Sequence, residues 1–195
     1  MRVFVAVEID DAVRGVLADA QATLKRVGGI KWVEPRNFHI TLRFLGETDR
    51  GTVSRLVNRL GALAAGSPAF RLEFAGVGVF PNERRPRVVW AGITGGFEQL
   101  FALAQGTEAI CQEIGFEPES KPFAAHLTLG RVKEALSGAE LGASLAALAD
   151  RQFGSQQVNQ IIIMESTLTG AGPIYRPVGK LSLNNSAAGE PNAEE

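Results

Sequence analysis

Residues 38–45 of this chain are Phe38-His39-Ile40-Thr41-Leu42-Arg43-Phe44-Leu45, in which apolar and polar side chains largely alternate. Because successive side chains of a β-strand point to opposite faces, this stretch predicts a half-buried strand with its apolar set on a core. His39 and Thr41 then lie side by side on the other face. Residues 126–129, His126-Leu127-Thr128-Leu129, repeat the pattern in the second half of the chain. Two strands of one design predict two similar lobes.

The segments around these strands predict a mixture of helices and strands. Apolar residues at helical spacing predict helices over 11–27, 49–66, 97–114 and 137–148, and β-branched or aromatic runs predict strands over 2–9, 69–79, 87–93, 123–131, 157–168 and 174–183. Some strands follow one another as hairpins and others are separated by helices, which indicates an α+β fold. Residues 1–183 are expected to form a single bilobal domain, and the tail 184–195, which has nothing to bury, is expected to be disordered.

Composition limits the class of protein. The chain has 195 residues, of which 45% are hydrophobic and 21% charged, as in ordinary globular proteins. Its net charge of −1 argues against a protein that coats nucleic acid through bulk positive charge, so a polyanion would have to bind a local basic patch. A single cysteine, Cys111, excludes an internal disulfide framework and a cysteine-based zinc site. The sequence has no apolar run that could span a bilayer and no signal peptide, so we expect a cytoplasmic location.

The two histidines of the chain both open the repeated tetrapeptide. An imidazole titrates near neutral pH, so one histidine can act as general base while the other acts as general acid. Such a pair suits in-line phosphodiester transfer or hydrolysis, in which threonine hydroxyls donate hydrogen bonds to the non-bridging oxygens. A metal site is the alternative, but two histidines need a third ligand, and the sequence offers none at a suitable spacing. A lone strand histidine is often structural, but a duplicated motif that holds both histidines favours function.

Beyond the tetrapeptides, the chain resembles the two-histidine phosphoesterase superfamily, and within it the bacterial and archaeal RNA 2′,3′-cyclic phosphodiesterases, historically called 2′-5′ RNA ligases. The resemblance covers residues 2–183. It rests on segments 2–7, 37–47, 76–81, 87–90, 121–123, 126–131, 165–166 and 172–175, which follow the family's order. One departure is Ala125, because the family commonly has a proline directly before the second histidine. This difference concerns how the strand begins and leaves the chemical groups in place.

The resemblance implies two pseudo-symmetric lobes, each a mostly antiparallel sheet with helices on the outside, and an active groove between them. It implies that His39 is the proton donor to the leaving 3′-oxygen and that His126 is the proton acceptor from the attacking water. Thr41, Thr128 and Arg131 would bind the phosphate. The implied substrate is RNA with 2′,3′-cyclic phosphate ends, tRNA fragments among them, and the product is a 2′-phosphomonoester. No cofactor, metal or membrane partner is implied, and we expect a monomer.

Three groups of arginines are candidates for further contacts with RNA. Arg131 has the opposite strand parity to His126, so it faces the groove only if a bulge or the strand end turns it, and a surface position is the alternative. Arg43 has the parity of Thr41 and is predicted either to reach the RNA backbone or to stay solvated. The turn with Arg84, Arg85 and Arg87 is predicted either to guide phosphates or to be a solvated loop.

The sequence leaves two other functions open. Ligation of a 2′,3′-cyclic phosphate end to a 5′-hydroxyl would use the same groups, with an RNA hydroxyl in place of water. A nucleotide- or RNA-binding module without turnover belongs to another class, but binding alone does not require matched proton donors and acceptors. Hydrolysis is therefore the predicted function.

Overall fold

The computed structural model describes residues 1–133, 138–170 and 172–185. Its strands are β1 (Arg2–Glu8), β2 (Ile30–Trp32), β3 (His39–Glu47), β4 (Phe70–Phe80), β5 (Val88–Gly95), β6 (Leu127–Val132), β7 (Gln152–Val158), β8 (Gln160–Thr169) and β9 (Gly172–Ser182). Its helices are α1 (Asp11–Leu24), the short 3₁₀ helix η1 (Pro35–Asn37), α2 (Arg50–Gly66), α3 (Phe97–Glu113) and α4 (Gly138–Ala146). The strands form two antiparallel sheets, with the orders β3-β1-β8-β9 and β2-β6-β5-β4-β7.

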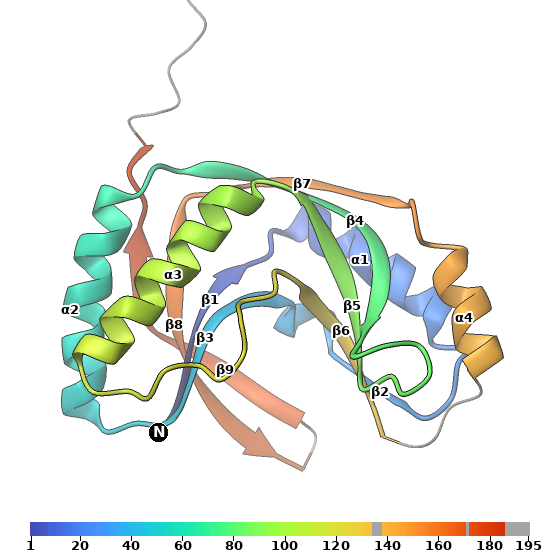
Figure 1. Ribbon diagram of the computed structural model, residues 1–195, viewed down its shortest axis with the longest axis horizontal. Coiled ribbons are helices and arrows are strands. Elements are labelled where there is room, and N and C mark those ends of the chain that lie inside the picture. Colours follow the sequence, from blue (N-terminus) through green and yellow to red (C-terminus); the bar gives the residue numbers. More distant parts are fainter. Residues whose placement is uncertain (134–137, 171, 186–195) are drawn as a thin grey trace, which may run out of the picture.

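Each sheet is covered on its outer side by helices, as Figure 1 shows. Helices α2 and α3 pack together against the four-stranded sheet, while α1 packs against β7 of the five-stranded sheet with α4 beside it. This arrangement confirms the predicted α+β fold of two lobes. The lobes are not the two halves of the sequence, however. Helix α1 follows a strand of one sheet and packs on the other, and α3 does the same in reverse.

Strand β1 is apolar on both faces because both are covered. Val3 and Val5 belong to the main core, which is continuous across both sheets. Phe4, on the opposite face, packs with Met164 in a small second cluster beside Tyr175. The face of the four-stranded sheet that turns away from its helices therefore has its own apolar floor.

Two helices each begin directly after an aspartate, Asp10 before α1 and Asp49 before α2. The Asp10 carboxylate accepts a hydrogen bond of 2.8 Å from the backbone N–H of Val13, and the Asp49 carboxylate accepts one of 2.9 Å from Thr52. Each bond satisfies a backbone donor that has no partner within its helix. The first helix ends at Leu24, three residues before its predicted end.

Two strand predictions and one boundary are corrected by the structure. The predicted single strand 157–168 is in fact parts of two strands. It covers the end of β7 and most of β8, which Asn159 separates. The predicted strand 123–131 begins only at Leu127. Asn184, placed in the predicted disordered tail, pairs through its backbone with Ser67 and Ala69. Residues 186–195 lie outside the described residues, so disorder there stays a prediction. Among the helices within the described ranges, none is long and apolar enough to cross a membrane.

Candidate active site

Strand β3 places the first histidine at its start. Ile40 and Leu42 are buried in the core, so His39 and Thr41 face away from it. The Nδ1 atom of His39 lies 2.7 Å from the carbonyl oxygen of Asn37. Because a carbonyl oxygen can only accept, Nδ1 carries a hydrogen and Nε2 is the atom left to exchange a proton with a ligand.

The second histidine lies one residue before β6 and is held in the same way. The Nδ1 atom of His126 lies 2.7 Å from the carbonyl oxygen of Ala124, again two residues earlier in the chain. Leu127 and Leu129 are buried, so His126 and Thr128 face away from the core. Both histidines therefore present Nε2, each with a threonine on the same strand face.

An aromatic ring packs edge-on against each imidazole. The rings of Tyr175 and His39 have centroids 5.3 Å apart at 89°, and those of Phe80 and His126 are 5.1 Å apart at 88°. Phe4, from the apolar floor described above, lies 4.8 Å from the His39 ring. Together with the Nδ1 hydrogen bonds, these contacts fix the orientation of both imidazoles.

Burial lowers the pKa of His39 below its ordinary value, although the hydrogen bond to Asn37 opposes this; the positive charges of Arg131 and His126 lower it further. Burial likewise lowers the pKa of His126, against the hydrogen bond to Ala124 and together with the charge of Arg131. The influence of one histidine on the other shows that they share one electrostatic environment. A negatively charged ligand there would raise both values, because it favours the protonated imidazoles.

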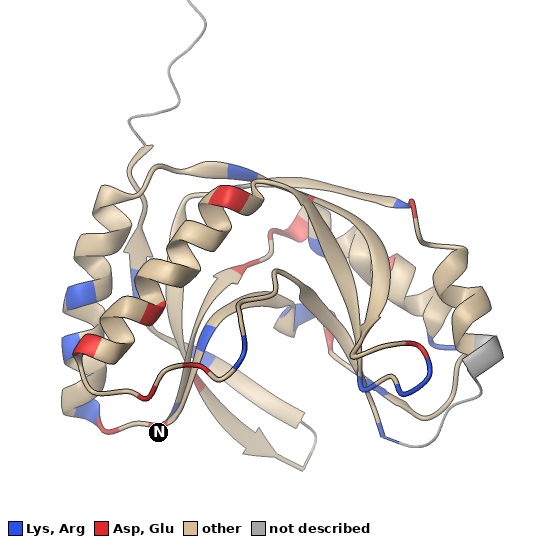
Figure 2. Cartoon of the chain, in the orientation of Figure 1, with Lys and Arg blue, Asp and Glu red and all other residues tan. Residues whose placement is uncertain are grey.

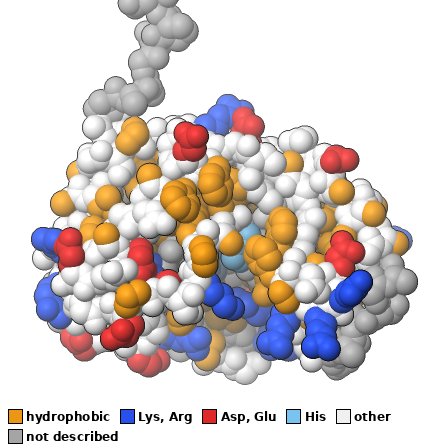
Figure 3. Space-filling view, in the orientation of Figure 1, with side chains coloured by type: hydrophobic (Ala, Val, Ile, Leu, Met, Phe, Trp, Pro, Cys, Tyr) orange, Lys and Arg blue, Asp and Glu red, His pale blue; other side chains and the backbone are white. Residues whose placement is uncertain are grey.

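Two hollows border the histidines. The larger has a volume of about 1050 Å³ and is lined by Thr41, Phe80, His126 and the segment 118–124. Figure 3 shows a histidine deep in a hollow between hydrophobic patches. Within the part of the chain that the structure describes, no group of three or more His, Cys, Asp or Glu side chains is arranged to hold a metal ion.

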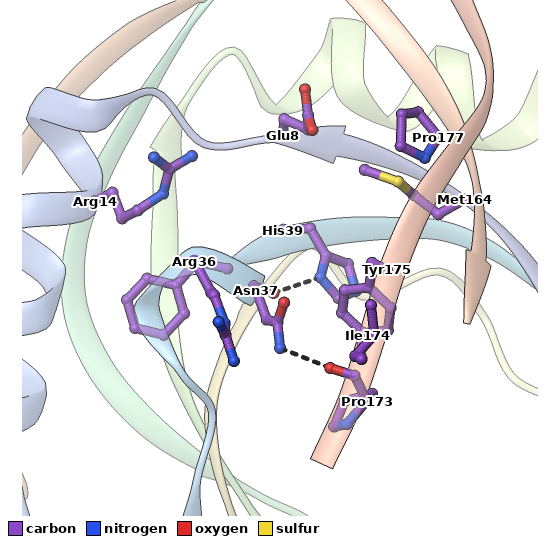
Figure 4. A pocket seen from close by; sticks show the side chains of 11 residues that line it. Glu8, Arg14, Arg36, Asn37, His39, Met164, Pro173, Ile174, Tyr175 and Pro177 are labelled. Carbon is purple, nitrogen blue, oxygen red and sulfur yellow. Dashed lines mark hydrogen bonds between the residues drawn. The ribbon is translucent and has the colours of Figure 1, made fainter. Parts of the chain in front are cut away.

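The smaller hollow has a volume of about 330 Å³ and is lined by His39, Asn37 and Tyr175 among others (Figure 4). Asn37 connects two of its walls: its backbone carbonyl holds His39, and its side-chain Nδ2 donates to the carbonyl oxygen of Pro173 over 3.1 Å. Glu8 and Arg14 line the hollow as well.

A β-bulge turns Arg131 toward the groove. In the pairing of β5 with β6, Leu129 is an extra residue between Thr128 and Gly130. One extra residue reverses the parity of those beyond it, so Arg131 lies on the face of Thr128. In agreement with this position, the charge of Arg131 lowers the pKa of both histidines, and it also acts on that of Tyr175, which burial raises. The sequence analysis required a bulge or the strand end to turn Arg131 toward the groove, and the structure has such a bulge.

A second β-bulge, in β3, turns Arg43 toward the core. The prediction that Arg43 shares the strand face of Thr41 is therefore wrong. The pairing of β1 with β3 makes Leu42 an extra residue, and the Arg43 side chain beyond it is only 7% exposed. Its Nε lies 2.8 Å from a carboxylate oxygen of Glu108, and it also pairs with Glu119 and donates to the carbonyl oxygen of Glu117. Arg43 is therefore an ion-paired residue that joins β3 to α3 and the loop after it.

The turn with Arg84, Arg85 and Arg87 joins β4 to β5, and all three side chains are exposed. The side-chain oxygen of Asn82 accepts hydrogen bonds of 3.1 Å from the backbone N–H groups of Arg84 and Arg85. In Figure 2 basic residues gather in this turn, on the side of the groove opposite α3. Contact of the turn with RNA stays a prediction.

Sequence reasoning missed the groups that orient the histidines. Asn37 and Ala124 act through backbone carbonyls, which no residue type reveals. Phe80 enters the sequence analysis only within segment 76–81 of the family resemblance, although its ring contacts His126. Both carbonyls belong to the residue two positions before the histidine, and this common spacing is recognised only once the hydrogen bonds are known.

Comparison with known proteins agrees with this geometry. The family model described as LigT like phosphoesterase matches residues 7–90 and 94–175. The chain belongs to the LigT-like phosphoesterase family. This assignment confirms the predicted membership in the two-histidine phosphoesterase superfamily.

Several relatives of this LigT-like phosphoesterase carry the name RNA 2′,3′-cyclic phosphodiesterase. The one from Archaeoglobus fulgidus is 39% identical over 176 residues, which are 90% of this chain and 97% of the relative. The one from Aeropyrum pernix is 37% identical over 173 residues, 88% of this chain and 97% of the relative. The predicted enzyme class is the one that these relatives are named for.

Solved structures show the same fold. The crystal structure of TT0787 of Thermus thermophilus matches with a TM-score of 0.82 and 32% identity, covering 95% of this chain and 100% of that one. The crystal structure of E. coli LigT complexed with 3′-AMP matches with a TM-score of 0.77 and 24% identity, covering 93% and 97% of the two chains. The second likeness concerns the fold alone.

Proposed function

We propose that this LigT-like phosphoesterase is an RNA 2′,3′-cyclic phosphodiesterase, which opens the cyclic phosphate at an RNA 3′ end to a 2′-phosphomonoester. One observation carries the proposal: two histidines, each with Nδ1 bonded to the carbonyl two residues earlier, present Nε2 beside a threonine on equivalent strands. Binding alone does not require two imidazoles held in the same tautomer. In-line transfer requires an acid and a base.

In the proposed reaction, Nε2 of His126 takes a proton from water as the water oxygen attacks phosphorus. The bond between phosphorus and the 3′-oxygen breaks, and Nε2–H of His39 gives its proton to that oxygen. The phosphate stays on the 2′-oxygen. A later proton exchange with solvent returns His126 to its neutral form and His39 to its protonated form. The assignment of acid and base follows the family resemblance.

Thr41 and Thr128 are proposed to donate hydrogen bonds to the non-bridging oxygens of the phosphate. Negative charge on these oxygens must be stabilised in the transition state, and fixed donors do so without reorganisation. Arg131, turned toward the groove by its bulge, supplies a positive charge from the five-stranded sheet. Acid, base and anion-stabilising groups are thus all side chains of the protein, and the proposed reaction requires no metal or cofactor.

The walls of the larger hollow support RNA as the substrate. Exposed Phe97 and Phe101 have ring centroids 5.9 Å apart, and Phe101 lies 6.4 Å from Phe123, which lines the hollow next to Lys121. Aromatic rings beside cations are the groups on which single strands stack and to which their phosphates bind. A cytoplasmic location, a monomeric state and tRNA fragments as natural substrates stay predictions.

Ligation is the second candidate, and the larger hollow has room for the second RNA end that it needs. About 1050 Å³ beside His126 is far more space than an attacking water needs. A 5′-hydroxyl end of RNA placed there would attack phosphorus in the same way as water, with His126 again taking the proton. The product would then be a 2′-5′ linkage.

Product analysis in EDTA tests the proposal. A short RNA with a 2′,3′-cyclic phosphate end is incubated with the protein, and 2′-phosphate, 3′-phosphate and ligated products are separated. We expect the 2′-phosphate, and for His39→Ala and His126→Ala a loss of about a hundredfold or more each, which is the usual contribution of general acid–base catalysis. A 3′-phosphate product, or histidine variants as active as the wild type, would contradict the proposal.

A further inference from the structure

Gln21 is a buried polar residue whose contacts lead to the active groove. It lies in α1 with its side chain fully buried. Its Nε2 donates two hydrogen bonds, to the carbonyl oxygen of Val33 at 2.7 Å and to that of Leu129 at 2.9 Å. Its Oε1 is buried without a hydrogen-bond partner among the described residues. A buried polar atom in that state is unfavourable, so an apolar residue would be the ordinary choice here.

The second acceptor, Leu129, is the extra residue of the bulge in β6. Its carbonyl oxygen also accepts a hydrogen bond of 2.9 Å from the backbone N–H of Val33. The bulged carbonyl is therefore held by donors from α1 and from the chain after β2. A β-carbon on the next residue, Gly130, would lie 2.7 Å from Ile30 and 2.8 Å from Trp32, so β2 also covers the bulge closely.

We propose that Gln21 is a positioning residue, whose amide holds the Leu129 bulge in the form that directs Arg131 at the phosphate. The amide bonds the bulged carbonyl, the bulge sets the parity of the strand beyond it, and that parity places Arg131 on the groove face. The inference rests on the proposed function for the identity of the phosphate, but not for the coupling between the two residues.

A double-mutant cycle tests this coupling, with the affinity for 2′-AMP measured by calorimetry as the readout. Gln21→Met removes the amide and keeps an unbranched side chain of similar length, and Arg131→Met removes the guanidinium. We expect Gln21→Met to weaken 2′-AMP binding about three- to tenfold when Arg131 is present, as for residues coupled through one network. In the Arg131→Met background it should cause no further loss.

The matched control is Gln156→Met. Gln156 is also buried and also bridges backbone groups, donating to the carbonyl of Glu8 at 2.8 Å and accepting from the N–H of Asp10 at 3.0 Å. Because it does not touch the bulge, its effect on 2′-AMP binding should be the same with and without Arg131. Should Gln21→Met fail to fold, Gln21→Asn, which is too short to reach both carbonyls, takes its place in the same cycle.

Equal weakening by the Gln21 variant in both backgrounds would overturn the proposal, because a general loss of structure does not depend on Arg131. No weakening in either background would overturn it as well. Both results are measured as 2′-AMP affinity and do not depend on hydrolysis. Hydrolysis is tested separately, with the wild type and the RNA substrate. Failure of the positioning role and failure of the proposed function are thereby told apart.

Discussion

The same His-x-Thr-Leu segment begins at the first residue of β3 and at the residue directly before β6, and both strands have a bulge at its leucine. Beyond that leucine the two strands differ. The next residue turns inward in both: Arg43 in β3 is ion-paired with α3 and its loop, whereas Gly130 in β6 leaves space that β2 fills. The residue after that one faces outward, away from the core, in both strands. In β3 it is Phe44, which is 43% exposed and lies 4.9 Å from the guanidinium of Arg2, and in β6 it is Arg131.

The positions that match between the two strands are those that the proposed chemistry requires. The positions that differ are those that contact different neighbouring elements. The reacting groups and their carbonyl and aromatic supports match in geometry, as two proton-transfer groups on opposite sides of one phosphate would. The residues beyond each bulge do not match, so the anion-binding guanidinium comes from the β6 side, while the matching position in β3 has an aromatic ring. Residue type alone would treat Arg43 and Arg131 as equivalent, and the bulges show that they are not.

Because the two His-x-Thr segments match in geometry, Thr41 and Thr128 are predicted to have equal roles. Thr41→Val and Thr128→Val should each lower kcat/KM by about a hundredfold, because each removes one donor to the phosphate oxygens. Thr→Ser at each position keeps the hydroxyl and should stay close to wild type. A large loss at only one of the two positions would break the proposed symmetry, and steady-state kinetics on an RNA cyclic phosphate decide this.

Because the residues beyond the two bulges do not match, substitutions of Arg43 and Arg131 are predicted to differ in their effect on the free energy of unfolding. Arg43→Met should lower the free energy of unfolding by about 2–3 kcal/mol, because it leaves charged partners of a buried ion pair unpaired. Arg131→Met should change that free energy by less than about 0.5 kcal/mol, as for an exposed side chain. Denaturant unfolding compares the two directly. If Arg131→Met were the more destabilising, the assignment of the inward and outward positions would be wrong.

Much of the fold and the reacting groups could be predicted from the sequence. The first two long helices start at Asp11 and Arg50, within one residue of their predicted starts, and period-two alternation places His39 and Thr41 on one face. Alternation failed for Arg43 because a bulge is a property of the pairing between two strands, which one strand's sequence does not contain. Strand β7 was missed because it is an edge strand with several polar residues, and only its pairing with β4 defines it.

The smallest predicted effect is a shift in pH dependence. The pKa values of both histidines lie below the ordinary value of about 6.5, so the bell-shaped profile of kcat/KM should have its maximum below that pH. Arg131 contributes to this lowering, and Arg131→Met should therefore raise both values and move both limbs to higher pH. Arg131→Lys keeps the charge and should leave the limbs in place. Unchanged limbs in Arg131→Met would contradict the groove-facing position of the guanidinium.

The central claim is that the two matched histidines have opposite proton roles, and a change of leaving atom tests it most directly. In a 2′,3′-cyclic phosphorothiolate with sulfur in place of the 3′-oxygen, the leaving thiolate is a weak base and needs no acid. We predict that His39→Ala recovers to within about tenfold of wild type on this substrate, while His126→Ala stays impaired by about a hundredfold or more. Recovery of His126→Ala instead, or of neither variant, would contradict the account.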